Sequence, residues 1–319
     1  MGFMTGIKAN KAYRMQKSGS EAEAIRLYEE CFAEGLNDPR YVLAYALLII
    51  RDGQYQKAKD FLVKHQKAPG MTQDQRTNLL VDYAVCCFRL GNTDKGIQTL
   101  EQQFRKTQNG LLYQTLGYLY VEKYDRANRP DFAAMTAARP DGEPGADTEA
   151  GDTAADGTTA GDAAANDTAA DDAAAGDAAA TAVAAAGEAE ERETPDEPIE
   201  KCLSPEEAWT EGEKRAEEFL LKAVEYDDED PICLDNMGQF LYRVKGDKEA
   251  ARPYFDKAID IKEGQIDTLY FLSRYDEEAG DCQAAVEKLQ KALNGRFSPL
   301  NYVSREQIER EIARLKGEG

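Results

Sequence analysis

The segment AARPYFDKA, residues 250–258, contains the spacing that decides how this chain folds. The small residue Ala251 is followed four positions later by the large apolar Phe255, and three positions after that by the small Ala258. On a helix this spacing puts all three side chains on one face. Five further sets have the same spacing: Ala24, Tyr28 and Cys31; Ala58, Leu62 and His65; Gly96, Leu100 and Gln103; Ala216, Leu220 and Ala223; and Ala285, Leu289 and Ala292. Most successive sets lie 34 to 38 residues apart, a period that indicates a solenoid of helical hairpins.

A glycine stands five residues before five of the six sets and marks the turn between the two helices of a hairpin. These glycines are Gly19, Gly53, Gly91, Gly246 and Gly280. Glycine suits a helix end because it adopts the left-handed conformation without a steric cost. Small residues also recur in the helix before each turn: Ala12, Ala46, Ala84 and Ser273 lie seven residues before the glycine, and Gly238 lies eight before it. A small residue at this position lets the two helices of a hairpin approach closely.

This pattern resembles the tetratricopeptide repeat, a helix–turn–helix unit of 34 residues. The closest matches are Leu116-Gly117 with Tyr120, Met237-Gly238, and Ala251 with Phe255 and Ala258. The chain departs from the family where a large aromatic residue is expected three positions before the leucine, since Leu80, Tyr113, Leu234 and Leu269 stand there. The resemblance covers residues 5–126 and 204–303. It implies an all-α solenoid of about six hairpins, and the capping-box sequence from Ser304 to Gln307 predicts a C-terminal capping helix that runs to about Lys316.

The regular series of small–large–small sets is interrupted in the fourth repeat. Its first helix is predicted from Leu111 to Tyr124, but the matching second helix begins only near Ser204, where a capping box with Glu207 predicts a helix start. We therefore expect one solenoid made of residues 5–126, with repeats 1–3 and the first helix of repeat 4, and of residues 204–317. Residues 127–203 form an insert in the turn of that hairpin. Two separate repeat domains joined by a linker remain the alternative.

The insert has a composition unlike the rest of the chain. Residues 139–200 contain 18 Asp or Glu and two Arg, and so carry −16 of the total charge of −21. Segments with low hydrophobicity and high net charge do not gain enough from burial to repay the entropy of folding. We expect a disordered acidic loop rich in Ala, Asp and Gly, either tolerated on the surface or able to contact basic residues of the solenoid.

The family resemblance also implies where a ligand would bind. In the family, first helices line the concave face, where peptides lie. One row of matching positions is Tyr13, Leu47, Val85, Tyr118, Gln239 and Arg274, and a second row is Lys17, Arg51, Arg89, Glu122, Arg243 and Glu278. With Tyr270, the predicted ligand-binding residues are Tyr13, Lys17, Leu47, Arg51, Val85, Arg89, Tyr118, Gln239, Arg243, Tyr270 and Arg274.

Four members of the second row are cationic, and two explanations fit them. A cation in the last turn of a helix offsets the helix dipole, and a row of cations could also bind acidic peptides. The Lys/Asn/Arg carboxylate clamp of chaperone-binding relatives does not map onto this chain. Where one repeat has Asn236, the next has Asp267 and Phe271.

Little in the sequence points to catalysis or to metal binding. His65 is the only histidine, none of the six cysteines forms a C-x-x-C pair, and no Gly-rich phosphate loop is present. We expect no catalytic residue, no metal site and no cofactor, and we expect the cysteines to be reduced thiols packed in the core.

The sequence therefore predicts a non-catalytic adaptor that binds a peptide or protein segment on its concave face. The alternative is a peptide-responsive sensor or regulator whose acidic insert modulates binding. The folded part has no concentrated cationic surface for nucleic acid. The sequence lacks an apolar signal segment and any apolar run long enough to span a bilayer, so no membrane insertion and a cytoplasmic location are expected.

Overall fold

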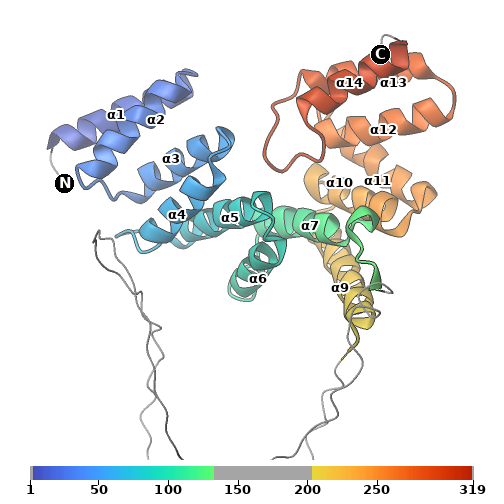
Figure 1. The fold of residues 1–319 in the computed structure, drawn as a ribbon, viewed down its shortest axis with the longest axis horizontal. Coiled ribbons are helices and arrows are strands. Elements are labelled where there is room, and N and C mark those ends of the chain that lie inside the picture. The colour runs from blue at the N-terminus through green and yellow to red at the C-terminus, as the bar shows by residue number, and fades with distance from the viewer. Residues whose placement is uncertain (1–2, 133–202, 318–319) are drawn as a thin grey trace, which may run out of the picture. The chain divides into compact units, whose positions relative to one another are not determined.

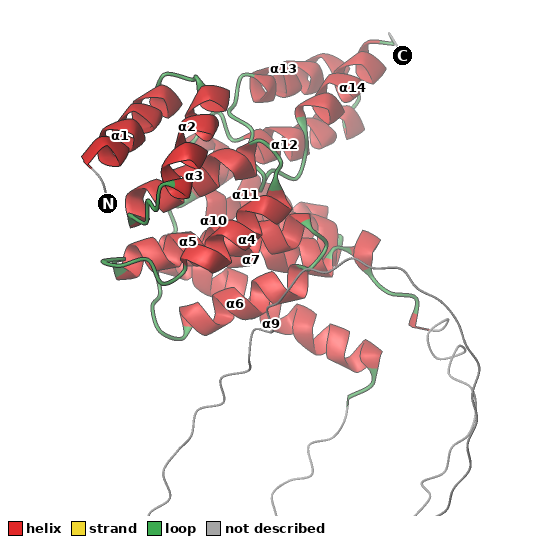
Figure 2. Ribbon diagram, turned by 60° about the vertical axis from the view of Figure 1, so that its left-hand side comes forward, coloured by secondary structure: helices red, strands yellow, loops and turns green. Residues whose placement is uncertain are grey.

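The computed structural model describes residues 3–132 and 203–317, and the elements within these ranges are all helical (Figures 1 and 2). The helices belong to one compact unit, which comprises Met1–Phe132 and Leu203–Gly319. Residues 133–202 of the predicted disordered insert, and with them the thiol of Cys202, lie outside the described residues. Residues 127–132 and 203 are described, and the prediction of disorder is wrong at Ala127 and Asn128, which belong to a 3-10 turn.

The helices pair in chain order into six hairpins followed by one further helix. The pairs are α1 (Phe3–Lys17) with α2 (Glu21–Ala33), α3 (Pro39–Arg51) with α4 (Tyr55–His65), α5 (Gln73–Arg89) with α6 (Thr93–Phe104), α7 (Gly110–Tyr124) with α9 (Pro205–Tyr226), α10 (Pro231–Gln239) and its extension η2 (Phe240–Lys245) with α11 (Lys248–Ile261), and α12 (Ile266–Glu278) with α13 (Cys282–Leu293). A short 3-10 turn, η1 (Arg126–Asn128), follows α7. The last helix, α14 (Arg305–Lys316), packs on α13.

The predicted all-α solenoid is confirmed, and the sequence pattern explains its packing. Every member of the six small–large–small sets is buried except His65, which is half-buried. The five turn glycines all have positive φ, from 75° at Gly246 to 87° at Gly19. Both predicted capping boxes are formed, by Ser204 with Glu207 and by Ser304 with Gln307.

The fifth hairpin contains a π-helical turn, η2, that directly follows α10. Its cause is visible in the sequence, because Gly238 lies eight residues before its turn glycine whereas the other repeats have seven. A π turn holds one extra residue within a helix without breaking it. The small residue stays at the helix contact, where a β-carbon on Gly238 would lie 2.7 Å from the ring of Phe255 in α11.

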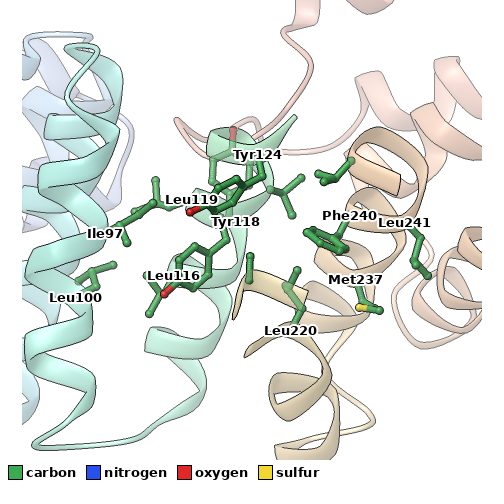
Figure 3. Close-up of a cluster of buried hydrophobic side chains, with 14 of the residues drawn as sticks. Ile97, Leu100, Leu116, Tyr118, Leu119, Tyr124, Leu220, Met237, Phe240 and Leu241 are labelled. Atoms are coloured by element: carbon green, nitrogen blue, oxygen red, sulfur yellow. The ribbon is translucent and has the colours of Figure 1, made fainter. Parts of the chain in front are cut away.

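The fourth hairpin closes even though its two helices are far apart in sequence. Leu116 and Leu119 from α7 share one buried cluster with Leu220 from α9 and with Phe240 (Figure 3). Gly117 allows this approach, because a β-carbon there would lie 3.0 Å from Cδ2 of Leu220. The two helices of the interrupted repeat therefore pack in the same way as those of its neighbours.

Four of the five described cysteines are buried, as predicted, and one is exposed. Cys31, Cys86, Cys87 and Cys233 are free and buried, whereas Cys282 is free and exposed at the start of α13. The prediction that every cysteine packs in the core is therefore wrong at Cys282, because the first residue of that helix points to solvent. Among the described helices, none combines the length and the apolar character needed to cross a membrane.

Candidate functional site

All of the predicted ligand-binding residues except Gln239 line four neighbouring depressions. The N-terminal hollow, of about 710 Å³, is lined by Tyr13, Lys17, Leu47 and Arg51. The central cavity, of about 470 Å³, is lined by Leu47, Val85 and Tyr118. The arginine hollow, of about 650 Å³, includes Arg51 and Arg89, and the C-terminal hollow, of about 580 Å³, includes Arg243, Tyr270 and Arg274. Gln239 lines none of the four, because its side chain is buried.

The central cavity brings together helices from both sides of the insert. Leu47 of α3, Val85 of α5 and Tyr118 of α7 lie on one side, and Ile266 of α12 lies on the other. Its wall is mainly apolar, but three aspartates also contribute, namely Asp82, Asp235 and Asp267. The cavity exists because the first helices of successive hairpins follow one another along one face.

A connection that the sequence analysis did not single out also enters this face. Residues 294–303, between α13 and α14, reach from the end of the chain toward the space between α3 and α10 (Figure 1). Leu300 packs against both of the two largest buried clusters. The sequence does contain a sign that this loop packs on the solenoid. The loop is longer than the other connections between repeats, and it contains the large apolar residues Phe297, Leu300 and Tyr302.

Asp267 of α12 fastens this loop to the solenoid. Its carboxylate accepts hydrogen bonds from Nδ2 of Asn301 at 3.0 Å and from the backbone nitrogens of Tyr302 at 3.1 Å and Val303 at 3.3 Å. The Tyr302 ring stacks on Phe271, with 5.3 Å between the ring centroids. Burial raises the pKa of Asp267, although these donors act in the opposite direction. The loop is therefore held at its C-terminal end. Its tip lies over a groove that the four depressions together form along the first helices of the hairpins.

A second carboxylate lies beside Asp267 in the first helix of the preceding repeat. Asp235 of α10 accepts hydrogen bonds from the Thr268 hydroxyl at 2.5 Å and from Nε2 of Gln239 at 2.7 Å. Burial, followed by the negative charge of Asp267, raises the pKa of Asp235. Gln239, a predicted ligand-binding residue, is thus engaged within the protein.

Arg243, in the π turn, is also engaged rather than free. Its guanidinium lies 2.7 Å from the carboxylates of both Glu122 and Asp125, and it donates to Oε1 of Gln239 at 2.8 Å. It also lies over the Tyr302 ring, 3.9 Å from the centroid. Burial acts to lower the pKa of Arg243, but the charges of Glu122 and Asp125 outweigh it, so the pKa is raised. This residue joins α7 to the following repeat.

The other cations of the predicted row are in a more open setting. Arg51 lies 3.9 Å from Glu21, the limit of an ion pair, and Lys17 lies over the Tyr13 ring. Arg274, from the other predicted row, is shared between Glu277 and Glu311 at 3.0 Å and 3.4 Å. The unneutralised positive charge of the row therefore lies toward its N-terminal end.

Metal binding finds no support in the helices themselves. Across residues 3–132 and 203–317, no group of three or more His, Cys, Asp or Glu side chains is arranged to hold a metal ion. The chemistry of the depressions is that of a binding groove with an apolar floor, buried acids and a partly cationic rim.

Comparison with known proteins places the fold among helical repeat proteins. A family model described as anaphase-promoting complex, cyclosome, subunit 3 matches residues 17–103. A tetratricopeptide repeat protein of Thermus thermophilus is similar in structure, with a TM-score of 0.50 and 11% identity over 88% of this chain and 99% of the other. Human IFIT1, solved with m7Gppp-AAAA, has a TM-score of 0.51 and 12% identity over 92% of this chain and 49% of its own. No curated protein sequence matches, and at these identities the structural likeness concerns the fold alone.

Proposed function

We propose that this tetratricopeptide repeat protein is a non-catalytic scaffold that holds a segment of another protein along the groove of its first helices. The fold is one of protein–protein interaction scaffolds in general. The observation that carries the finer proposal is the central cavity, because predicted groove residues from successive repeats line it together. Its volume of about 470 Å³ lies within the range of ligand pockets in proteins, roughly 300–1,000 Å³.

The lining of the groove suggests the kind of segment that it would hold. Leu47, Val85 and Ile266 provide apolar surface for large side chains. The ends of the groove carry charged groups that would fix the direction of an extended peptide. A non-catalytic role is supported by the surroundings of His65, whose ring packs against Phe61 and whose Nδ1 lies 2.9 Å from Oδ1 of Asn37.

A matched pair of substitutions tests the groove. Leu47 is half-buried and lines two depressions, whereas Leu221 is exposed on α9 and lines none of the four described above. Peptides selected from a random library for binding to the native chain should bind the Leu47→Trp variant at least about tenfold more weakly, because the indole fills the groove. They should bind Leu221→Trp as they bind the native chain. Equal affinities for the two variants would contradict the proposal.

The second candidate is a sensor or regulator in which the acidic insert competes with a ligand. Its support is that residues 139–200 carry a charge of −16 and belong to the same chain as the cations near the groove. Because the segment is tethered, its effective concentration near these cations is high. A chain that lacks residues 139–200 should then bind acidic peptides more tightly at low salt. Unchanged affinity would contradict the regulatory candidate and leave only the scaffold proposal.

We also propose that the protein works in the cytoplasm. Five described cysteines are free thiols, among them the adjacent buried pair Cys86 and Cys87. Such thiols are typical of a reducing compartment. Fluorescence microscopy of the tagged full chain in its native cell would test this location.

A further inference from the structure

Two arginines from distant parts of the chain line the N-terminal part of the groove together. Arg51 is the last residue of α3, and Arg296 lies in the loop that Asp267 fastens. Both residues line the N-terminal hollow and both line the arginine hollow. These two depressions are therefore continuous around the pair.

The surroundings of the pair contain more positive than negative charge. The two hollows are lined by six cationic side chains, Lys17, Arg40, Arg51, Arg89, Arg296 and Arg305, and by three acidic ones, Glu21, Asp82 and Glu306. Arg40 is neutralised by two hydrogen bonds to Asp38, of 3.2 Å and 2.9 Å. Within the described residues, Arg296 takes part in no ion pair. Lys17, Arg89 and Arg305 likewise have no ion pair among the described residues, so the surplus surrounds Arg51 and Arg296, the two cations that line both hollows.

Two of the three nearby acids, Glu21 and Asp82, offset this surplus only in part. Glu21 reaches Arg51 only at 3.9 Å. Burial raises the pKa of Asp82 to about 7, so this carboxyl is partly neutral near neutral pH. Burial, and then the like charge of Arg296, lower the pKa of Arg51. An anion between the two guanidinium groups would remove this repulsion.

We infer that Arg51 and Arg296 form a two-arginine subsite that binds a carboxylate of an acidic, partly apolar segment of a partner protein. The inference rests on the proposed function and adds the chemistry of the segment. Guanidinium groups donate parallel hydrogen bonds that match the two oxygens of a carboxylate. Leu43, Leu47 and Leu111 line the N-terminal hollow beside the pair and would receive the neighbouring apolar side chains.

A peptide fits these hollows better than a nucleic acid does. A polyanionic backbone places a charge at each phosphate and would meet Glu21, Asp82 and Glu306 as well as the arginines. A peptide can place single carboxylates at the arginines and uncharged side chains near the acids. Mixed charge with apolar surface therefore favours a protein segment.

The probe for the test is a fluorescein-labelled decapeptide of alternating Glu and Leu, measured by anisotropy with the full chain. Arg51→Glu and Arg296→Glu should each weaken binding by about tenfold or more, because each removes a charge-assisted hydrogen bond and introduces repulsion. The double variant should lose less than the product of the two single effects, since both arginines hold one carboxylate. Arg296→Lys should retain part of the affinity.

Arg105→Glu provides the matched control, because Arg105 is exposed after α6 and lines neither hollow. It changes the net charge by the same amount and should leave the affinity within about twofold. Replacing every Glu of the probe by Gln should weaken its binding to the native chain by about tenfold.

Several results would overturn the inference: no binding of the Glu–Leu probe, equal binding of its Gln form, or Arg51→Glu and Arg296→Glu variants that behave like Arg105→Glu. Tighter binding of a single-stranded RNA decamer that both arginine variants abolish would assign the pair to nucleic acid instead. If Leu47→Trp weakens the library-selected peptides while the arginine variants bind every probe normally, the scaffold proposal stands and the two-arginine subsite fails.

Discussion

The guanidinium of Arg243 lies 2.7 Å from the carboxylate of Glu122 and joins two helices that are 121 residues apart in sequence. The side chains are 5% and 15% exposed, so both charges are largely removed from water. Asp125 completes the group at 2.7 Å. Arg243 therefore joins the first helix of the fourth repeat to the fifth repeat, across the insert, and it also contacts Tyr302 at the C-terminal end of the loop.

Arg243→Ala should destabilise the chain strongly. It leaves the buried carboxylates of Glu122 and Asp125 without their cation, a change that costs about 3–5 kcal/mol in comparable sites. The free energy of unfolding in urea, followed by circular dichroism, measures this loss.

Arg274→Ala is the control for that substitution. Arg274 also contacts two carboxylates, but its side chain is 30% exposed, so its loss should cost no more than about 1 kcal/mol. Similar losses for the two variants would show that the Arg243 group is not buried as described.

Gly238→Ala should destabilise the fifth hairpin. The added methyl group would lie 2.7 Å from the Phe255 ring, and overpacking of this kind costs about 1–3 kcal/mol. Gly110→Ala is the matched change, since nothing lies within 4 Å of the added carbon at the start of α7. Thermal unfolding should separate the two variants, and a Gly238→Ala chain as stable as Gly110→Ala would contradict the close packing of η2 on α11.

The repeat pattern predicted the hairpins because its small and large residues are the contacts themselves. Ala251, Phe255 and Ala258 are each fully buried, so their spacing carries the packing information directly. Likewise, Gly238 lies eight residues before its turn glycine, one more than in the other repeats, which is consistent with the π turn. This extra residue could be interpreted as a π turn only once the contact of Gly238 with Phe255 was known.

The groove was less predictable, because its chemistry depends on contacts between distant segments. Position in the repeat places Arg51 and Arg243 in one row, yet Arg243 is enclosed by Glu122 and Asp125 whereas Arg51 faces a hollow. No local pattern indicates that Arg296 reaches Arg51 from a loop 245 residues later. Helix periodicity specifies faces, but it does not specify which charges meet across a groove.

Asp267→Ala should release the loop that carries Arg296. The backbone amides of Tyr302 and Val303 lose their acceptor, so their hydrogen exchange should become about tenfold faster. The variant should also bind the Glu–Leu probe more weakly, because Arg296 is no longer held near Arg51. Asp260→Ala, at an exposed position on α11, should change neither measurement. Unchanged exchange in Asp267→Ala would show that the carboxylate does not hold the loop.

Asp82→Asn should alter how stability depends on pH. Burial raises the pKa of Asp82 to about 7 from its ordinary value of 3.8, while Arg51 opposes the shift. The folded chain thus holds this proton more strongly than the unfolded chain does. The associated stability is fully present below about pH 4 and is lost as the pH rises to about 7.

The advantage of the Asn variant over the native chain should therefore be larger at about pH 8 than at about pH 4, by at least about 1 kcal/mol. This figure is well below the full effect of such a shift, because Asp82 lines two open hollows. Urea unfolding at the two pH values measures the difference, and an equal advantage at both would assign Asp82 an ordinary pKa.

The most direct test concerns the closure of α7 on α9, since α7 and α9 connect the part of the chain that carries Arg51 to the part that carries Arg296. Trp209, the only tryptophan, lies on α9 with its ring 5.1 Å from that of Tyr124 on α7 and 6.3 Å from that of Phe132. Its fluorescence emission should be blue-shifted relative to the chain unfolded in urea, and Tyr124→Ala should move it to longer wavelength. Native emission equal to that of the unfolded chain, and unchanged by Tyr124→Ala, would contradict the closed fourth hairpin.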